Sequence, residues 1–596
     1  MKQTIGLAMI VRDEEENLAN CLKSVQGLVD EIVVVDTGSA DRTVEIARRY
    51  TDKVFLYHWH NDFSAARNFA ITRTGSDWIL SLDADEQLDA VPADLRVLAN
   101  NDSGYEAYLL PLCNRTPEST SDYSRFPVLR FFRNSAEYRF RGRIHEQVTV
   151  SRPGVVGIAE RPVIWHQSRS GKERNRKRGR NLTLLRRSAA AEPNNPFLQY
   201  YLGVEWLGLG KAAKALPCLQ ESCARLTDTQ VLFRAPAVRF LVICLKTLGK
   251  IDEAICVCIE ESLRYPAYTD LFFEGGVLFE QRGEYEIAIK WFKEAINCGR
   301  PPAIFSHTNG TESFLSLYHL GYCHEKLGRP KPAKDYYEHA LSSEPGYIYP
   351  LYGLFLLCLA EKGPQGAFEH LKLAGHLACP EQAEALAELF FEAGCAELAC
   401  ACLESAAGLR EPAAGERSFT SDKNMARRLA RFLVYAGRFE EALALIDCIR
   451  CTGGEIDREL TATEVVALIL QEEYKEAKTK AFSLWRRAEG RDAAWALVNL
   501  ISLCRNGSLS GRPEKNREAA VVQATVEILE NCLRHAPMSP GTGISSSARL
   551  AAKTIELLIH LSPLGCTALS AYLQGKAAAV RRMMEYKCGP AGRLLS

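Results

Sequence analysis

Residues 78–86 read WILSLDADE, an apolar run followed at once by acidic residues. The run is typical of a buried strand, and Asp83 and Asp85 come at its exit, where nucleotides usually bind in α/β sheets. Side chains two positions apart on an extended chain point to the same side. Because ionised carboxylates cannot be buried unpaired, this pair suits a hard divalent cation that bridges phosphates. The alternative for an isolated Asp-x-Asp is a surface turn.

The composition is that of an ordinary soluble protein with several domains. The chain has 596 residues, too many for one core, and is 47% hydrophobic and 24% charged. Its formal net charge of +0 gives no reason to expect nucleic acid or a membrane surface as partner. No apolar run is long enough to span a bilayer, and residues 5–11 read as a strand instead of a signal sequence. We therefore expect a cytoplasmic protein without a transmembrane segment.

The 20 cysteines do not predict a disulfide framework. Most lie inside helical apolar patterns, where cysteine serves as a small hydrophobe. Cys448 and Cys451 form a lone CxxC with no second pair at zinc-binding spacing. We expect buried thiols there as well.

Strand and helix patterns alternate up to about residue 170. Residues 5–11 and 31–36 are continuous apolar runs of the kind buried on both faces of a parallel sheet, and residues 53–57 read as a third strand. Helices with acidic starts follow the first two strands. This rhythm predicts a doubly wound, mostly parallel sheet. Three later segments are expected to be strands of a second layer: residues 105–112, 128–133 and 138–150.

Helical patterns dominate from about residue 193, with self-similarity at a period of 34 residues. Small residues recur where two helices of a hairpin must cross closely, and an aromatic residue fills the next groove. The clearest unit has Leu320, Gly321, Gly328, Ala333, Tyr337, Ala340 and Pro345. These are the small and aromatic positions of tetratricopeptide repeats, which this half of the chain resembles. The whole pattern predicts a domain at residues 1–190, an all-α repeat solenoid at 191–500 and a helical cap at 501–596.

Four motifs of the first half occur in the order found in family-two glycosyltransferases of GT-A fold. They are MIVRDEE at 9–15, VVDTGSADRT at 34–43, DFSAARN at 62–68 and DADE at 83–86. Residues 4–185 resemble that family through these motifs. The resemblance implies a Rossmann-like GT-A domain that uses a nucleoside-diphosphate sugar, by family habit a UDP-sugar, with Mn²⁺ or Mg²⁺.

The resemblance also implies roles for individual residues. Asp36 would read the nucleotide base, Asp83 would contact the ribose, and Asp85 would bind the metal. Arg67 would approach the diphosphate, and Glu86 could orient the metal waters. Further donor contacts would come from other positions of the same motifs: Val11, Arg12, Glu14 and Ala84. The alternatives are an Asx turn or helix N-cap for Asp36 and a surface salt bridge for Arg67.

A catalytic base is predicted within residues 142–147, which read GRIHEQ and also look like a family motif. An inverting transferase needs a base near the acceptor nucleophile, and a carboxylate is the usual solution. Glu146 is the candidate. The alternative is a strand-edge carboxylate paired with Arg141 or Arg143, while the neighbouring His145 is either a metal ligand or a packing residue.

Two features after residue 163 complete the predicted site. His166 follows a strand, and enzymes of this fold often supply a late histidine to the metal shell; the alternative is a core or capping histidine. Residues 169–187 are strongly basic, which taken alone suggests a nucleic-acid patch or a solvated helix face. In a glycosyltransferase this segment would close over the leaving diphosphate. Lys177 and Arg180 match a KxxRN pattern that commonly follows the late histidine in this subgroup.

The leading hypothesis is therefore a metal-dependent, non-processive, inverting glycosyltransferase. Its architecture is similar to that of sublancin-type peptide S-glycosyltransferases, so the acceptor is a peptide, a protein or a cell-envelope glycan. The repeats would recognise that acceptor or a partner, and self-association through them is open. The acidic residues after the first strand would repel a triphosphate, which argues against a nucleotidyltransferase. The remaining alternative is a non-catalytic repeat scaffold with an inactive transferase domain.

Overall fold

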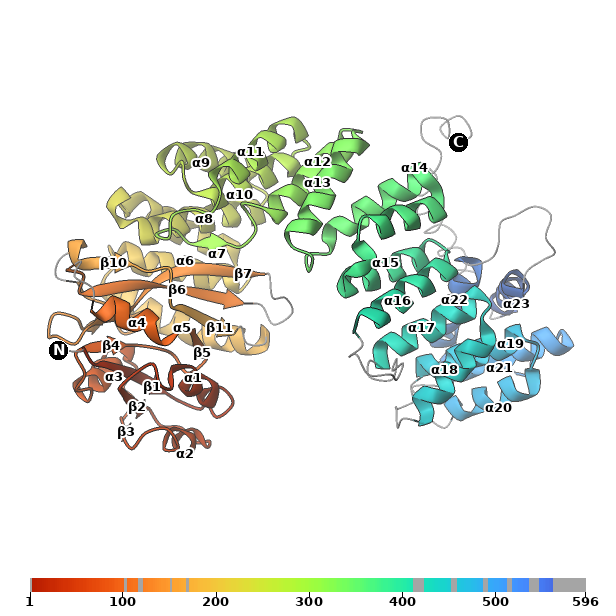
Figure 1. The fold of residues 1–596 in the computed structure, drawn as a ribbon, viewed down its shortest axis with the longest axis horizontal. Coiled ribbons are helices and arrows are strands. Elements are labelled where there is room, and N and C mark those ends of the chain that lie inside the picture. Colours follow the sequence, from red (N-terminus) through yellow and green to blue (C-terminus); the bar gives the residue numbers. More distant parts are fainter. Residues whose placement is uncertain are drawn as a thin grey trace. The chain divides into compact units, whose positions relative to one another are not determined.

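The computed structural model describes residues 3–100, 104–115, 122–150, 153–167, 171–410, 423–451, 458–485, 491–511, 517–534 and 546–560. These residues form two compact units, and the division in the chain falls between Glu344 and Pro345. The first unit contains a sheet and the first repeat helices, and the second unit is helical (Figure 1). The predicted boundaries at residues 190 and 500 stay predictions.

The first unit is built on a mixed sheet of ten strands, in the order β3-β2-β1-β4-β7-β6-β11-β5, with β10 beside β6 and β12 beside β7. The pairs from β3 to β4 are parallel, which confirms the doubly wound part of the prediction. The strands are β1 (Ile5–Val11), β2 (Glu31–Asp36), β3 (Val54–Leu56), β4 (Trp78–Leu80), β5 (Glu86–Asp89), β6 (Ala107–Arg115), β7 (Tyr123–Arg133), β10 (Val156–Ile158), β11 (Val163–Gln167) and β12 (His307–Thr308).

Apolar side chains are buried on both faces of this sheet. On one face the strands pack against Leu18 and Leu22 of α1 and Leu95 of α4. On the other face they pack against Ala70 and Ile71 of α3. The N-terminus of α3 is capped by Asp62, whose side chain accepts a hydrogen bond from the Ala65 amide. The helices that flank the sheet are α1 (Leu18–Val25), α2 (Thr43–Ala47), α3 (Phe63–Thr72), α4 (Pro92–Ala99) and α5 (Gly171–Ala191).

The expected second layer of strands is not formed. β7 pairs with β4 in antiparallel orientation, so β6 and β7 continue the first sheet instead of covering it. Only the segment after Tyr138 leaves this sheet, as the short antiparallel pair β8 (Phe140–Arg141) and β9 (Gln147–Val148). The prediction failed because apolar alternation identifies a strand but not its partner.

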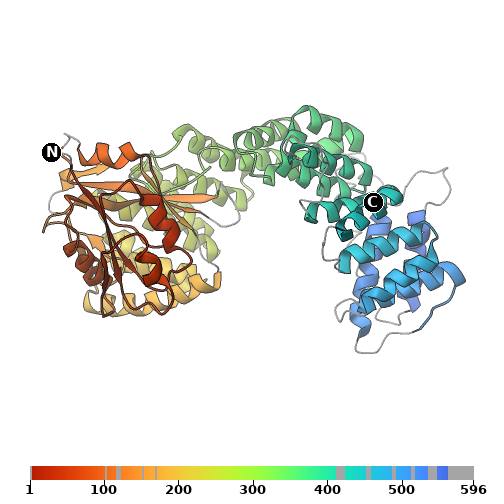
Figure 2. The same cartoon turned by 60° about the horizontal axis from the view of Figure 1, so that its bottom comes forward.

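The predicted repeats are present in the first unit as antiparallel helix hairpins (Figure 1; Figure 2 shows them from another side). The predicted small residues lie where the helices cross. A Cβ on Gly276 would be 2.6 Å from Phe292, and one on Gly321 would be 2.5 Å from Tyr337. The helices are α6 (Pro196–Gly208), α7 (Ala212–Arg225), α8 (Val231–Thr247), α9 (Ile251–Arg264), α10 (Thr269–Gln281), α11 (Tyr285–Cys298), α12 (Phe314–Lys326) and α13 (Pro330–Ser343).

One segment of the repeats joins the sheet. Between α11 and α12 the chain forms β12, which pairs with the start of β7, with His307 opposite Arg125. The Asn309 amide also donates to the carbonyl of Tyr123 at 3.0 Å. Part of the edge of β7 is thus covered by backbone from the repeat half, which removes unpaired strand groups from solvent.

The second unit continues with paired helices after a break at Gly363 inside α14, where φ is 67°. Cys448 and Cys451 are exposed on α18, so the expectation of buried thiols is wrong for this pair. No helix of the described residues is long and apolar enough to cross a membrane. Of the predicted C-terminal cap, residues 561–596 lie outside the described residues. The helices are α14 (Tyr349–Leu373), α15 (Pro380–Glu392), α16 (Ala396–Arg410), α17 (Lys423–Ala436), α18 (Phe439–Cys451), α19 (Arg458–Leu470), α20 (Tyr474–Trp485), α21 (Arg491–Asn506), α22 (Glu518–Arg534) and α23 (Ser546–His560).

Candidate active site

Asp83 lies just beyond β4, where two arginines neutralise it. Arg67 of α3 donates from Nη2 to Oδ1 at 2.5 Å, and Arg130 of β7 donates from Nη2 to Oδ2 at 2.9 Å. Burial alone would raise the pKa of Asp83, but the two guanidinium charges outweigh it and hold that pKa below its ordinary value. Asp83 is therefore ionised, and the two arginines fix the orientation of its side chain.

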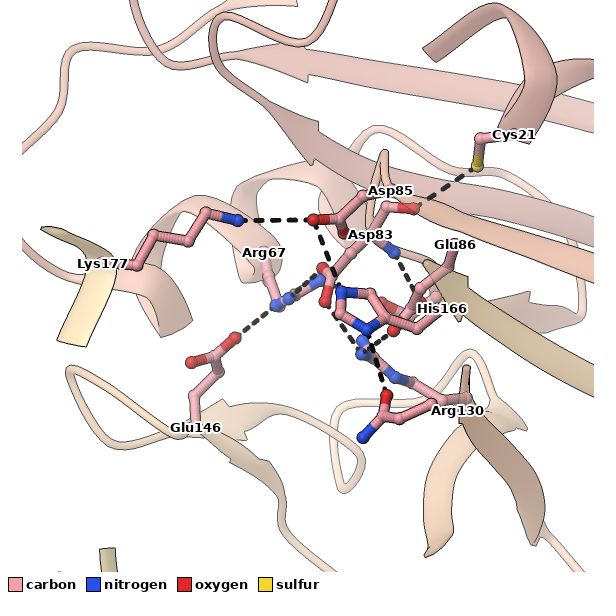
Figure 3. A network of polar contacts seen from close by, with 11 residues as sticks. Cys21, Arg67, Asp83, Asp85, Glu86, Arg130, Glu146, His166 and Lys177 are labelled. Carbon is pink, nitrogen blue, oxygen red and sulfur yellow. Dashed lines mark hydrogen bonds and ion pairs between the residues drawn. The ribbon is translucent and has the colours of Figure 1, made fainter. Parts of the chain in front are cut away.

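Asp85 has different surroundings (Figure 3). Its Oδ2 lies 3.3 Å from Nζ of Lys177 on α5 and 3.6 Å from Nε2 of His166 on β11. Burial acts to raise the pKa of Asp85, but His166 and Lys177 lower it to about 2. Nδ1 of His166 is held by Oδ1 of Asn114 at 3.0 Å. With Nδ1 held by that amide oxygen, Nε2 is the ring nitrogen that lies toward Asp85.

Glu86 supports the turn between these two aspartates. It is buried, its Oε2 accepts from the Asp83 amide at 2.8 Å, and its Oε1 accepts from Arg130 at 2.8 Å. Burial, helped by the negative charge of Asp83, raises the pKa of Glu86 to about 7 despite Arg130. Ala84 between the aspartates is buried in the apolar core of the sheet.

Glu146 faces Arg67 across the site (Figure 3). It lies in the loop between β8 and β9, and its Oε1 accepts from Nε of Arg67 at 2.5 Å. Within the described part of the chain, Glu146 thus pairs with Arg67 and not with Arg141 or Arg143, the partners that the sequence suggested. Arg67 is 7% exposed, so its ion pairs are buried instead of superficial.

Val11 and Asp36 lie side by side at the carboxyl ends of β1 and β2, in the register of that parallel pair. The carboxylate of Asp36 accepts hydrogen bonds from the Gly38 amide at 2.9 Å and from the amide and hydroxyl of Ser39. Asp36 is thus engaged in the Asx turn that was its alternative interpretation. A role in reading a base would have to use its remaining lone pairs.

The other predicted donor contacts are spread along the same edge. Glu14 accepts from the side chain of Asn17 at 2.8 Å, and the exposed Arg12 lies beside Asp13. Arg180 lies over the ring of Phe63, with Cζ 5.6 Å from the ring centroid. The structure thus gathers Arg67, Asp83, Asp85, Glu146, His166 and Lys177 into one network.

Sequence reasoning missed Arg130 and Asn114. Arg130 stands between Leu129 and Phe131 of β7, and a partly buried charge among apolar residues needs an acidic partner. That signal could have identified it. Asn114 gave no such signal, because only the pairing of β6 with β11 brings it opposite His166.

The arrangement offers two ligands for a divalent cation. The described residues contain no group of three or more His, Cys, Asp and Glu side chains that could hold a metal. Mg²⁺ and Mn²⁺ sites that act on nucleotides often take only one or two protein ligands and complete the shell with water and phosphate oxygens. Adjacent ligands of such an octahedral ion lie about 3 Å apart, close to the spacing of Asp85 and His166. The donor set therefore fits.

Comparison with known proteins gives two matches to family models. Residues 7–141 match the glycosyl transferase family 2 model, and residues 315–347 match a tetratricopeptide repeat model. The first range contains Asp36, Arg67 and both aspartates of the site. The second range covers α12 and α13.

Several known protein sequences are similar to this chain. A TPR repeat-containing protein of Synechococcus elongatus is 30% identical over 58% of this chain and 68% of its own length. Glycosyltransferase SunS of Bacillus subtilis is 27% identical over 46% of this chain and 67% of its own length. The lipopolysaccharide core biosynthesis glycosyltransferase LpsC of Rhizobium meliloti is 27% identical over 28% of this chain and 63% of its own length.

Solved structures with a similar helical arrangement include repeat proteins. The C-terminal part of a TPR repeat-containing protein from Cytophaga hutchinsonii is 15% identical and covers 44% of this chain and 96% of its own, with a TM-score of 0.30. MamA is 19% identical over 30% of this chain and 96% of its own, with a TM-score of 0.25. Likeness at this level says nothing about function.

Proposed function

Since the chain belongs to the family 2 glycosyltransferases and carries tetratricopeptide repeats, we propose that it transfers a sugar from a nucleoside-diphosphate sugar to an acceptor. The proposed reaction depends on a metal, is non-processive and inverts the anomeric centre. One observation carries this proposal. Asp83 is neutralised by two arginines, whereas two positions further on Asp85 faces a lysine and a histidine. A phosphate-bridging cation suits the second environment and would be repelled by the first.

We propose that the donor lies along the carboxyl ends of β1, β2 and β4. Val11, Arg12, Glu14 and Asp36 would surround the nucleoside, with Asp36 reading the base. Asp83 and Ala84 would contact the ribose, and Arg67 orients Asp83. UDP is the first nucleotide to test, because family resemblance favours it.

Asp85 and His166 would hold Mn²⁺ or Mg²⁺, with Asn114 fixing the orientation of the histidine ring. When bound, the cation supplies positive charge to the diphosphate and so makes it a better leaving group. Lys177 lies on the same side and would add a second positive charge there. Arg180, which is on the same helix as Lys177 and lies over Phe63, is the next candidate to contribute positive charge.

The transfer step requires a base. The acceptor nucleophile forms a bond to the anomeric carbon, the bond between that carbon and the diphosphate oxygen breaks, and the nucleoside diphosphate leaves with the electron pair. The proton of the nucleophile goes to a carboxylate, for which we propose Glu146. Its contact with Arg67 ties the base to the same arginine that holds Asp83, so acceptor and donor sides share one anchor.

The acceptor would be a peptide, a protein or a cell-envelope glycan. The repeats support the first two, because grooves of stacked helix hairpins bind extended chains. The name of the Rhizobium meliloti relative, which refers to lipopolysaccharide core biosynthesis, supports the third. Assays with each class of acceptor and a radiolabelled donor decide among them.

Nucleotide binding tests the donor site. The melting temperature of the full chain is measured with UDP, GDP and dTDP, each with and without Mn²⁺. Binding at a hundredfold excess over Kd stabilises the native state by about 2.7 kcal/mol. We expect a metal-dependent rise with one nucleotide. No rise with any of the three would contradict the proposed function.

A further inference from the structure

A buried carboxylate outside the donor site joins three segments of the first unit. Glu205 lies on α6, the first repeat helix, and is 5% exposed. Its Oε2 accepts from Nη1 of Arg178 at 2.9 Å, and its Oε1 accepts from Nδ2 of Asn181 at 2.9 Å; both partners lie on α5. Oε1 also lies 3.6 Å from Nε2 of His145, in the loop before β9. A carboxylate this buried depends on such partners.

Apolar contacts connect the same three segments. Ile144 of the loop, Leu182 and Leu185 of α5, and Leu202 of α6 form one buried cluster. The ring of His145 stacks on that of Tyr201, with centroids 4.0 Å apart and an interplanar angle of 6°. Helix α6 therefore supports the loop and α5 at once.

The loop has a backbone that needs this support. His145 has φ of 49°, in the left-handed region that a side chain with a Cβ rarely adopts. Such a conformation persists where the surroundings over-determine it. The stacking on Tyr201 and the approach of Glu205 supply that constraint. Glu146 is the next residue, so its position depends on the same contacts.

Two routes run from Glu205 to the active site. On α5, Lys177 precedes Arg178, and successive helical side chains point about 100° apart, so anchoring Arg178 on α6 directs Lys177 elsewhere. That direction leads to Asp85, at 3.3 Å. Through the loop, the second route leads from His145 to Glu146 and its contact with Arg67.

We infer that Glu205 is a positioning residue for the transfer reaction. By binding Arg178 and Asn181 and lying against His145, it sets where Lys177 meets the leaving diphosphate and where Glu146 meets the acceptor. This inference rests on the proposed function of the site. It makes the first repeat helix part of the support of the catalytic centre, so that the repeats act in the reaction and not only in holding an acceptor.

The chain offers a matched control for Glu205. Glu261 of α9 is also buried and binds Arg234 at 2.7 and 2.8 Å, but it joins helices of the repeats to each other. Glu205→Gln and Glu261→Gln each remove one buried negative charge beside an arginine. A general loss of stability affects both variants, whereas a positioning role affects only the first.

Hydrogen exchange of the full-length protein tests the positioning without any assay of activity. In Glu205→Gln we expect peptides from residues 142–147 and 171–191 to exchange about tenfold faster, because a charge-assisted anchor is lost. In Glu261→Gln the same peptides should exchange as in the wild type. Unchanged exchange in Glu205→Gln, or an equal increase in both variants, overturns the inference.

Kinetics test the consequence for catalysis. At saturating donor and Mn²⁺, we expect Glu205→Gln to lower kcat about tenfold or more, with a smaller change in KM for the donor, since Lys177 acts on charge that develops as the diphosphate leaves. Glu261→Gln should keep the wild-type kcat. Equal kcat values for the two variants overturn the inference. A wild type without turnover of any donor contradicts the proposed function instead, and the exchange result alone then decides the role of Glu205.

Discussion

Among the described residues, the repeats contact the N-terminal half of the first unit at two places with different chemistry. Helix α6 meets α5 and the loop of residues 142–147 through Glu205, next to residues of the active site. β12 pairs with β7 at Arg125, five residues before Arg130 and so about 17 Å away along the strand. The first contact lies where small movements change the positions of Lys177 and Glu146. The second contact affects only the attachment of the repeats to the sheet.

The β12 contact is anchored by a buried cluster of charges. Asp270, which is 0% exposed, accepts from the Thr308 amide at 2.8 Å and lies 2.7 Å from Nδ1 of His307 and 3.2 Å from Nη1 of Arg239. Nε2 of His307 lies 3.1 Å from Glu312. Such a cluster fixes one segment in place, and removing one member leaves the others buried without compensation. We therefore expect changes at the Glu205 contact to affect catalysis and changes at the β12 contact to affect stability, and this difference can be tested.

The largest effect should come from removing both contacts. A chain that ends at Ala191 keeps α5 but exposes Leu182, Leu185 and Ile144, at a cost of about 2 kcal/mol for each large apolar side chain. We expect this shorter chain to lack a cooperative melting transition and to bind no nucleotide. A chain that ends at Glu344, where the first unit ends, should keep the melting transition and the nucleotide binding. Equal nucleotide binding by the two chains would show that the repeats do not support the site.

The next effect concerns the site itself. Asp85→Asn removes the charge that faces His166 and Lys177, and with it the proposed cation. We expect donor hydrolysis or transfer to fall by about a hundredfold or more, because leaving-group stabilisation of this kind is worth several kcal/mol. Because Asp85 also pairs with His166 and Lys177, the melting temperature should fall as well, but the protein should still unfold in a cooperative transition. Asp89→Asn, at an exposed position of β5, is the control and should retain the activity of the wild type.

A smaller effect, on stability, should follow from Asp270→Asn. The variant leaves Arg239 and His307 with less compensation, so we expect the free energy of unfolding to fall by about 3 kcal/mol. Nucleotide affinity of the folded protein should stay within twofold of the wild type, about 0.4 kcal/mol. Asp252→Asn, which loses only an exposed ion pair with Arg282, serves as the control. A loss of nucleotide affinity in the folded Asp270 variant would mean that the two contacts do not act separately.

The smallest effect should be a dependence of stability on pH. Burial acts to lower the pKa of His307, but Asp270 and Glu312 raise it from 6.5 to about 9. The stabilising contribution is therefore fully present below pH 6.5 and is lost as the pH rises through about 9, with an upper limit of about 3 kcal/mol. Melting temperatures between pH 6 and pH 9.5 should show this decline. His307→Gln should flatten the profile, and an equally steep profile in that variant would assign the decline to other groups.

The sequence predicted well what depends on short stretches of chain. The apolar runs before Asp36 and Asp83 identified β2 and β4, and the pattern of small and aromatic residues that includes Gly276 and Gly321 identified the helix crossings. Each of these depends on residues within one or two elements. The roles of Asp36 and Asp83 in binding the donor, and of Asp85 in binding the metal, are still proposals, but the placement of these residues at one edge of the sheet agrees with the sequence pattern.

Contacts between distant segments were not predictable in the same way. The pairing of Glu146 with Arg67 joins residues 79 positions apart, and the chemistry of a carboxylate does not choose among several arginines. The segments at residues 105–112 and 128–133 were wrongly expected in a second layer, because alternation identifies a strand but not its partner. β12 has only two residues and lies in a stretch without a strand pattern, so nothing in its sequence indicated that it pairs with β7.

Calorimetric titration with UDP, or with the nucleotide that the melting measurements identify, tests the central claim most directly. The wild type and Asp85→Asn are titrated with and without Mn²⁺. We expect Mn²⁺ to tighten binding to the wild type at least about tenfold, equal to 1.4 kcal/mol, and to leave the variant unchanged. Binding that is equally tight without Mn²⁺, or a response to Mn²⁺ that survives in Asp85→Asn, would contradict a metal-dependent donor site at this edge of the sheet.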